Sequence, residues 1–256
     1  MLSFYRRLRQ YLLSEGKIGK YLQYAVGEII LVVIGILIAL QINTWNSERL
    51  AKKQMDTFLQ GILEDLKSDT ANFNTRIQFF EGLGENLKSL LVRTDFSDIS
   101  ADSMYLILRP RVADYELNSS TFDKIASTGI TQISSNDSLS KGIYNYYTVG
   151  ATNLKSTMDW DKDGSTETGH FLYYEQSTFE LNLAGYDLAN LDSIQNFQDE
   201  ATRKRNLIQL LSEPTGRNHF KLGYARKMSL ASRLVRFSDR ATALILAIEK
   251  ELDRSN

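Results

Sequence analysis

The sequence contains no cysteine, only two histidines and only two prolines in 256 residues. The absence of cysteine excludes disulfides, thiolate metal ligands and cysteine nucleophiles. With His170 and His219 alone, a histidine-rich metal centre is excluded as well. Because proline interrupts helices and normally makes up about 5% of a protein, so low a content predicts an almost wholly helical chain.

Neither sign of charge predominates, with 30 Lys+Arg against 31 Asp+Glu and a net charge of −1. A dedicated nucleic-acid-binding protein normally carries a strongly basic surface, so we expect no nucleic-acid partner. The P-loop, the nucleophile elbow and the zinc-protease signature are all missing from the sequence. The pair Gly82 and Gly84 lacks the third glycine of a dinucleotide loop. We therefore expect the protein not to be an enzyme and assign no catalytic residue.

One stretch departs from this soluble composition, because residues 29–40 (IILVVIGILIAL) carry no polar side chain. With the flanking residues on both sides the stretch reaches the roughly 20 residues that a transmembrane helix needs, and Trp45 is placed as an interfacial aromatic. A cleaved signal peptide fits poorly, because nearly thirty residues precede the apolar core and no small-x-small site follows it. A buried helix of a soluble protein is the remaining alternative. We predict a transmembrane helix over 21–46.

The basic residues on the two sides of this span predict its orientation. Those before it are Arg6, Arg7, Arg9, Lys17 and Lys20, and those close behind it are Arg49, Lys52 and Lys53. Under the positive-inside rule this bias places the N-terminus in the cytoplasm. We expect residues 47–256 to form a periplasmic domain of an inner-membrane protein. Residues 1–20 are expected to lie amphipathically on the lipid headgroups, with an unstructured topogenic signal as the alternative.

The small and polar residues of the span fall on one face. In an α-helix Glu28, Gly35, Ala39 and Asn46 lie within about 20° of one line. Helices associate in lipid through small residues and interhelical hydrogen bonds, so this face predicts contact with a second copy or with another membrane subunit. For Glu28 the alternatives are that it reaches the interface, where Lys20 or Tyr24 would pair with it, or that it handles protons.

The block GEIILVVIGILIALQINTWN at 27–46, preceded by Phe4-x-Arg6-Arg7-x-Arg9, resembles an uncharacterised family common in Bacteroidota, especially flavobacteria. The specific similarity covers about the first fifty residues. A weaker similarity lies at 119–147, and Thr44 stands where asparagine is expected. The resemblance implies an inner-membrane protein with a helical domain of unknown function, and it supplies no activity or catalytic residue.

Helical periodicity continues through 47–256 and predicts an all-α bundle. The seam is clearest in the last helix, expected over 218–253, where apolar residues recur every three or four positions. Asn136 begins another expected helix that ends at Met158. The remaining expected helices cover 47–92, 102–108, about 120–129 with Ser120 as N-cap, 168–183 and 195–212.

Only one constellation follows metal-binding logic. Asp159, Asp161 and Asp163 alternate ahead of Gly164, as in the opening of a calcium loop. Position 12 of the loop is His170, a poor calcium ligand, so a solvated acidic turn between two helices is the alternative reading. For the basic stretch 203–205 the two interpretations are a phosphate site and a solvated helix face.

From these features we expect an assembly or interaction module that is held in the lipid bilayer and contacts partner subunits. The alternative is a periplasmic bundle that senses a ligand and signals through a partner in trans.

Overall fold

The computed structural model describes residues 18–112, 115–176, 178, 180, 181, 183 and 194–255. The membrane-surface segment predicted over 1–20 lies almost wholly outside these residues. Within the described part of the chain every regular element is helical, which confirms the all-α prediction. The chain divides into two units, Met1–Met55 and Asp56–Asn256.

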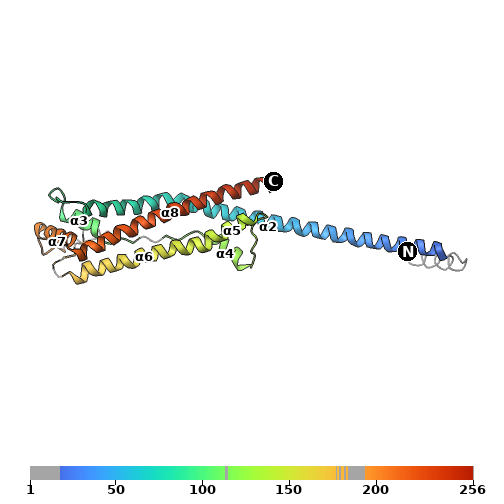
Figure 1. Ribbon diagram of the computed structural model, residues 1–256, viewed down its shortest axis with the longest axis horizontal. Coiled ribbons are helices and arrows are strands. Elements are labelled where there is room, and N and C mark those ends of the chain that lie inside the picture. Colours follow the sequence, from blue (N-terminus) through green and yellow to red (C-terminus); the bar gives the residue numbers. More distant parts are fainter. Residues whose placement is uncertain are drawn as a thin grey trace. The chain divides into compact units, whose positions relative to one another are not determined.

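The first helix, α2, runs over Ile18–Leu91 without a break and so confirms the helix expected to continue out of the apolar segment (Figure 1). It contains one apolar window that is long enough to cross a membrane, and none of that window is buried within the protein. Its large apolar side chains, such as Leu31 and Leu37, are more than half exposed. The apolar window is therefore not a core helix of this chain, and its place in a membrane stays a prediction.

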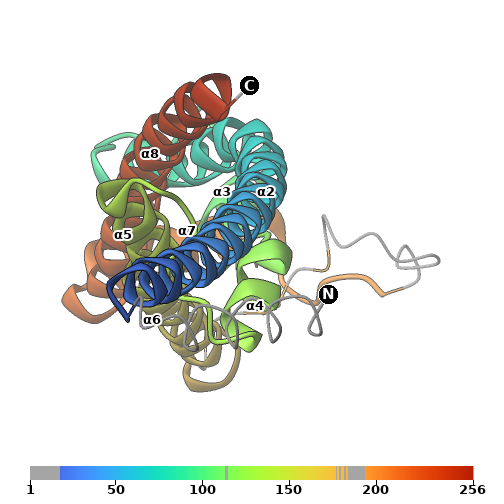
Figure 2. The same cartoon turned by 90° about the vertical axis from the view of Figure 1, so that its right-hand side faces the viewer.

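The unit Asp56–Asn256 is a bundle of three long helical segments. The part of α2 beyond Met55, the helix α6 (Ala151–His170) and the helix α8 (Pro214–Ser255) lie side by side in both views (Figures 1 and 2). Proline at the start of α8 suits a first helical position, where its missing N–H leaves no hydrogen bond unmade. The short helices α3 (Ala101–Leu108) and α7 (Glu200–Ser212) pack together.

The helix expected from Asn136 is confirmed at its start and wrong at its end. The side chain of Asn136 caps α5 (Asp137–Asn145) by accepting from two backbone N–H groups. The chain then passes through a π-helical turn, η1 (Tyr146–Gly150), into α6, and through a second π-helical turn, η2 (Phe171–Glu175). The break expected after Met158, and with it a separate helix over 168–183, is absent from this continuous run.

The helix α4 (Ser120–Ser127) begins one residue away from expectation, with Ser119 rather than Ser120 at the N-cap. Gly129 follows it with φ +72°, the left-handed conformation that suits glycine at a helix end. The side chain of Ser119 makes no capping bond to the backbone. That N-terminus is satisfied instead by a carboxylate of α2, described below.

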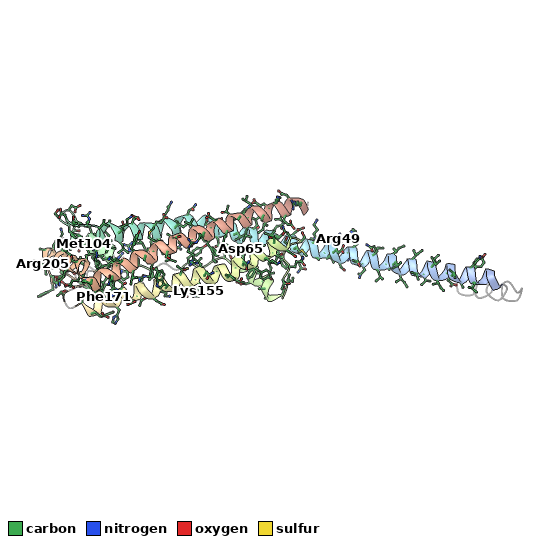
Figure 3. The ribbon with its side chains drawn as sticks, viewed as in Figure 1. Arg49, Asp65, Met104, Lys155, Phe171 and Arg205 are labelled. Carbon is green, nitrogen blue, oxygen red and sulfur yellow. The ribbon has the colours of Figure 1, made fainter. Side chains whose placement is uncertain are left out.

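The core consists of two apolar clusters that follow one another along the bundle. The first includes Phe73 of α2 and Phe237 of α8, whose ring centroids are 6.0 Å apart. The second includes Met104 and Phe171, which Figure 3 shows toward the end of the bundle formed by α3 and α7. Along α6 and α8 the stretch between the two clusters contains the buried polar residues Asp161, Ser165, Thr168, Arg226 and Lys227. A polar layer therefore interrupts the core.

Candidate functional site

The helical geometry of α2 places the four predicted contact residues on one face. Glu28, Gly35, Ala39 and Asn46 are all exposed, and Leu37 points to the opposite side of the helix. A Cβ atom at Gly35 would meet nothing within 4 Å. Among the described residues, nothing in this chain therefore fills the notch at Gly35. Contact of this face with a partner stays a prediction.

Asn46 has a partner within its own helix. Arg49 Nη2 donates to Asn46 Oδ1 over 3.5 Å, and the Arg49 guanidinium lies 5.9 Å from the centre of the Trp45 ring. An aromatic ring beside a basic residue at the end of an apolar stretch is typical of a membrane–water interface. Contact of Asn46 with another helix stays a prediction.

Within the bundle, two buried aspartates of α2 hold the segment that leads into α4. Asp65 Oδ2 accepts from the Thr121 N–H over 2.8 Å, and Asp69 Oδ1 accepts from the Asn118 N–H over 3.1 Å. The Tyr115 hydroxyl also donates to Asp69 Oδ1, over 3.1 Å. A carboxylate at a helix N-terminus is stabilised by the unpaired N–H groups there. Asp65 therefore takes the capping role that the sequence suggested for a serine.

The pKa of Asp69 is raised, first by burial and to a smaller extent by the nearby charge of Asp65, while the bonds from Asn118 and Tyr115 oppose the rise. Burial also raises the pKa values of Tyr115, Tyr146 and Tyr147, so these hydroxyls stay protonated. A pair of buried acids on adjacent turns thus lies among neutral tyrosines. Sequence reasoning missed both aspartates; the signal was their i, i+4 spacing on the core-facing side of an apolar stripe.

A cavity of about 520 Å³ opens beside this segment. Its apolar wall includes Leu117, Leu154 and Met158, and charged residues such as Lys155 and Asp123 also line it. Tyr147 reaches it from the π-helical turn η1, and its buried hydroxyl has no hydrogen-bond partner. The volume suits a small molecule, and π-helical turns occur frequently at functional sites. The cavity is therefore a candidate ligand site in the described part of the bundle.

The predicted calcium loop is wrong in its conformation. Asp159, Asp161 and Asp163 lie within α6, where alternate residues point in nearly opposite directions and cannot converge on one ion. Asp161 is 2% exposed and accepts from Lys227 Nζ over 2.6 Å, whereas Asp159 pairs with Lys155 over 3.0 Å. Among the described residues no group of three His, Asp or Glu side chains is placed to hold a metal. The calcium hypothesis thus loses its geometric basis.

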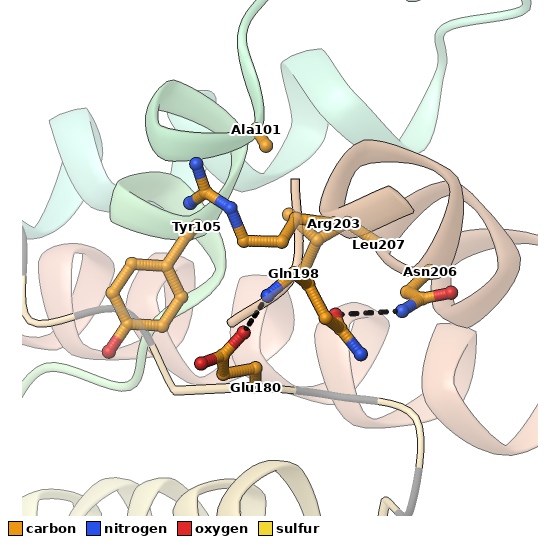
Figure 4. Close-up of a pocket in the computed structure, with 7 residues that line it drawn as sticks. All are labelled: Ala101, Tyr105, Glu180, Gln198, Arg203, Asn206 and Leu207. Carbon is orange, nitrogen blue, oxygen red and sulfur yellow. Dashed lines mark hydrogen bonds between the residues drawn. The ribbon is translucent and has the colours of Figure 1, made fainter. Parts of the chain in front are cut away.

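Within the basic stretch 203–205, Arg203 forms ion pairs with acidic side chains of the bundle. Arg203 Nη1 contacts Asp102 of α3 over 2.5 Å and Nη2 contacts Glu200 over 3.2 Å. The nearby pocket measures only about 10 Å³, and in it Glu180 accepts from the Gln198 N–H over 2.6 Å while the side chains of Gln198 and Asn206 pair over 3.2 Å (Figure 4). So small a space holds at most about one water molecule. These residues join α7 to its surroundings.

Comparison with known proteins identifies one similarity. Residues 28–154 match a family of unknown function (DUF6090). The match begins in the apolar segment and extends over Asp65, Asp69, α4, α5 and η1. No curated protein matches the chain. No solved structure matches it either. The DUF6090 match supports the resemblance to an uncharacterised family and brings no activity with it.

Proposed function

We propose that the protein is a single-pass inner-membrane protein, with a cytoplasmic N-terminus and a periplasmic helical bundle, that works as a non-enzymatic assembly module. Its transmembrane face, formed by Glu28, Gly35 and Ala39, contacts a second copy or another membrane subunit. The observation that carries the proposal is that no part of the apolar window of α2 is buried within the protein. So large an exposed apolar surface is unfavourable in water and needs lipid or another helix to cover it.

The polar and small residues favour a protein partner over lipid alone on one side of this helix. A carboxylate in an apolar span is costly unless it reaches water or a partner. The bare surface at Gly35 allows close approach of another backbone, which is how helices gain packing energy in lipid. Lipid would cover the opposite side at Leu37 without any such feature.

The test is native-gel migration of the full-length protein extracted from its own membranes in mild detergent. Gly35→Ile and Glu28→Gln are expected to remove the slower complex. Gly27→Ile is the matched control. A Cβ atom at Gly27 also meets nothing within 4 Å, and Gly27 lies about 80° away from Gly35 around the helix. Unchanged migration of both face variants, or equal loss with Gly27→Ile, would contradict the proposal.

A second candidate function, ligand sensing by the bundle, is favoured by the 520 Å³ cavity. Signalling would then pass through a partner protein in trans. The test is a thermal-shift screen of the full-length protein against small metabolites. A stabilising compound whose effect is lost in Tyr147→Phe supports sensing at this cavity. Absence of any such compound supports the assembly module alone.

A further inference from the structure

The polar layer between the two apolar clusters contains a small cavity with an excess of positive charge. The cavity measures about 30 Å³ and lies where α6, α8 and the chain following α3 meet. Its polar lining includes Arg109, Arg111, Thr168, Arg226 and Lys227. Four of these five residues are cationic, and none of the lining residues that the structure describes carries a carboxylate.

A single buried carboxylate, that of Asp161, serves this cluster. Lys227 Nζ, on a side chain 5% exposed, donates to Asp161 Oδ2 over 2.6 Å and to the Arg111 carbonyl over 2.5 Å. The Arg226 Nε lies 3.8 Å from Asp161 Oδ1, which is too long for a hydrogen bond. Asp161 therefore hydrogen-bonds Lys227 through Oδ2, while its other oxygen, Oδ1, makes no hydrogen bond and forms only this longer ion pair with Arg226. One buried carboxylate thus faces two buried cations.

The guanidinium of Arg226 has unused donors. Arg226 is 5% exposed, its Nη2 makes one long contact of 3.5 Å to Thr168 Oγ1, and its Nε has no hydrogen-bond partner. Arg111 Nε is buried without a partner as well. Buried polar groups are nearly always hydrogen-bonded, and each exception calls for an explanation. Two unpartnered arginine nitrogens at one cavity point to an anion.

The surrounding electrostatics agree with this geometry. Burial lowers the pKa of Arg226, although the charges of Asp161 and Glu167 oppose the change. Burial together with the nearby charge of Arg109 lowers the pKa of Arg111. Burial lowers the pKa of Lys227 also, with a smaller contribution from Arg226, and Asp161 opposes the change. Each cation is therefore held in surroundings that disfavour its charge, and an anion bound among them would relieve this.

We propose that this cavity binds a small oxyanion, a phosphate or sulfate group, between Arg226 and Arg111. Arginine presents N–H donors in a planar fork that matches such groups. The cavity can be reached from solvent past three half-buried lining residues, Arg109, Arg111 and His219. The cavity volume of about 30 Å³ is two to three times the roughly 10–15 Å³ that one water needs, so an oxyanion requires side-chain adjustments to fit. This site does not depend on the proposed membrane contact.

Gly164 is the residue that admits Arg226 to this position. A Cβ atom at Gly164 would lie 2.5 Å from both Cζ and Nη1 of Arg226, so alanine there must displace the guanidinium. Gly164→Ala therefore disturbs the site without removing any charge. Gly82→Ala is the matched control, because a Cβ there meets nothing within 4 Å.

The test is calorimetric titration of the full-length protein in detergent with inorganic phosphate and with sulfate, against chloride at equal ionic strength. A saturable isotherm with one site, weakened at least tenfold in Gly164→Ala and unchanged in Gly82→Ala, is expected. Arg111→Gln, at a half-buried position, is expected to weaken binding as well and covers the case in which the glycine variant fails to fold. A phosphomonoester in place of phosphate shows whether the group is bound free or as part of a larger molecule, and binding of either supports the site.

Three results would overturn the proposal. The first is no heat beyond that of chloride at millimolar phosphate and sulfate. The second is binding that persists unchanged in a folded Gly164→Ala variant and in Arg111→Gln. The third is equal weakening by Arg236→Gln, which removes an exposed charge elsewhere on α8 and would show unspecific attraction.

Discussion

Replacing Asp161 with alanine should destabilise the bundle far more than any exposed aspartate of the same helix. Asp161 is 2% exposed and Lys227 is 4% exposed, with 2.6 Å between Asp161 Oδ2 and Lys227 Nζ. Removing one partner of a buried pair leaves the other charge uncompensated and costs about 3–5 kcal/mol. For a domain of this size each kcal/mol shifts the melting temperature by about 2–4 °C. We expect a fall of about 6–20 °C.

The assay is thermal unfolding of the full-length protein, followed by circular dichroism at the helical band in buffer free of phosphate and sulfate. Asp163→Ala is the control, since Asp163 is exposed two residues further along α6, and a surface change of this kind stays within about 0.5 kcal/mol. The double variant Asp161→Ala, Lys227→Met should recover part of the loss because it removes both charges of the pair, while Arg226 still lacks its ion-pair partner. A melting temperature for Asp161→Ala equal to that of Asp163→Ala would refute the reasoning.

Three further predictions concern the segment around α4. Asp69→Asn removes a carboxyl whose folded-state pKa lies above its ordinary 3.8. Because the folded state holds this proton more tightly than the unfolded state, the wild type should gain stability relative to the variant as pH falls from 7 toward 4. Urea titrations at several pH values measure this trend, and its reversal would contradict the raised pKa. Gly61→Ala would place a Cβ atom 2.7 Å from Thr121 Cγ2 and should lower the free energy of unfolding by about 1–3 kcal/mol. Adding Thr121→Ala to this variant should restore stability. The control Gly82→Ala should instead raise the free energy of unfolding by about 0.5–1 kcal/mol. Tyr147→Phe deletes a buried hydroxyl without a partner and should leave the melting temperature equal or higher; a clear fall would reveal a bond to that hydroxyl.

The helical architecture could be predicted because its determinants are local. Few prolines, apolar periodicity and an asparagine cap at Asn136 are all visible within one or two helical turns of sequence. The same local reasoning failed over 159–170, where alternating aspartates and Gly164 imitate a loop. The helix persists there because Asp161 is paired with Lys227 of α8 and because Gly164 makes room for Arg226. Neither contact is visible until α6 and α8 are placed side by side.

The candidate sites were predictable to different degrees. The face of Glu28 and Gly35 follows from helical periodicity alone, because the geometry needs only one helix. The cationic cavity required three segments far apart in sequence. A signal existed nonetheless, since Lys227 stands three residues before Leu230, at a position that continues the apolar seam of α8 backward. A basic residue at a seam position indicates a buried partner.

The most direct measurement of the central claim uses the natural absence of cysteine. Single cysteines at Ala39 and at Leu37, on opposite faces of the same helix, can be introduced into the full-length protein and crosslinked in native membranes with oxidant or a short bismaleimide. We expect a discrete crosslinked product of higher mass from Ala39→Cys, either a dimer or an adduct with another subunit, and none from Leu37→Cys. Equal crosslinking from both positions, or none from either, would contradict a specific contact face.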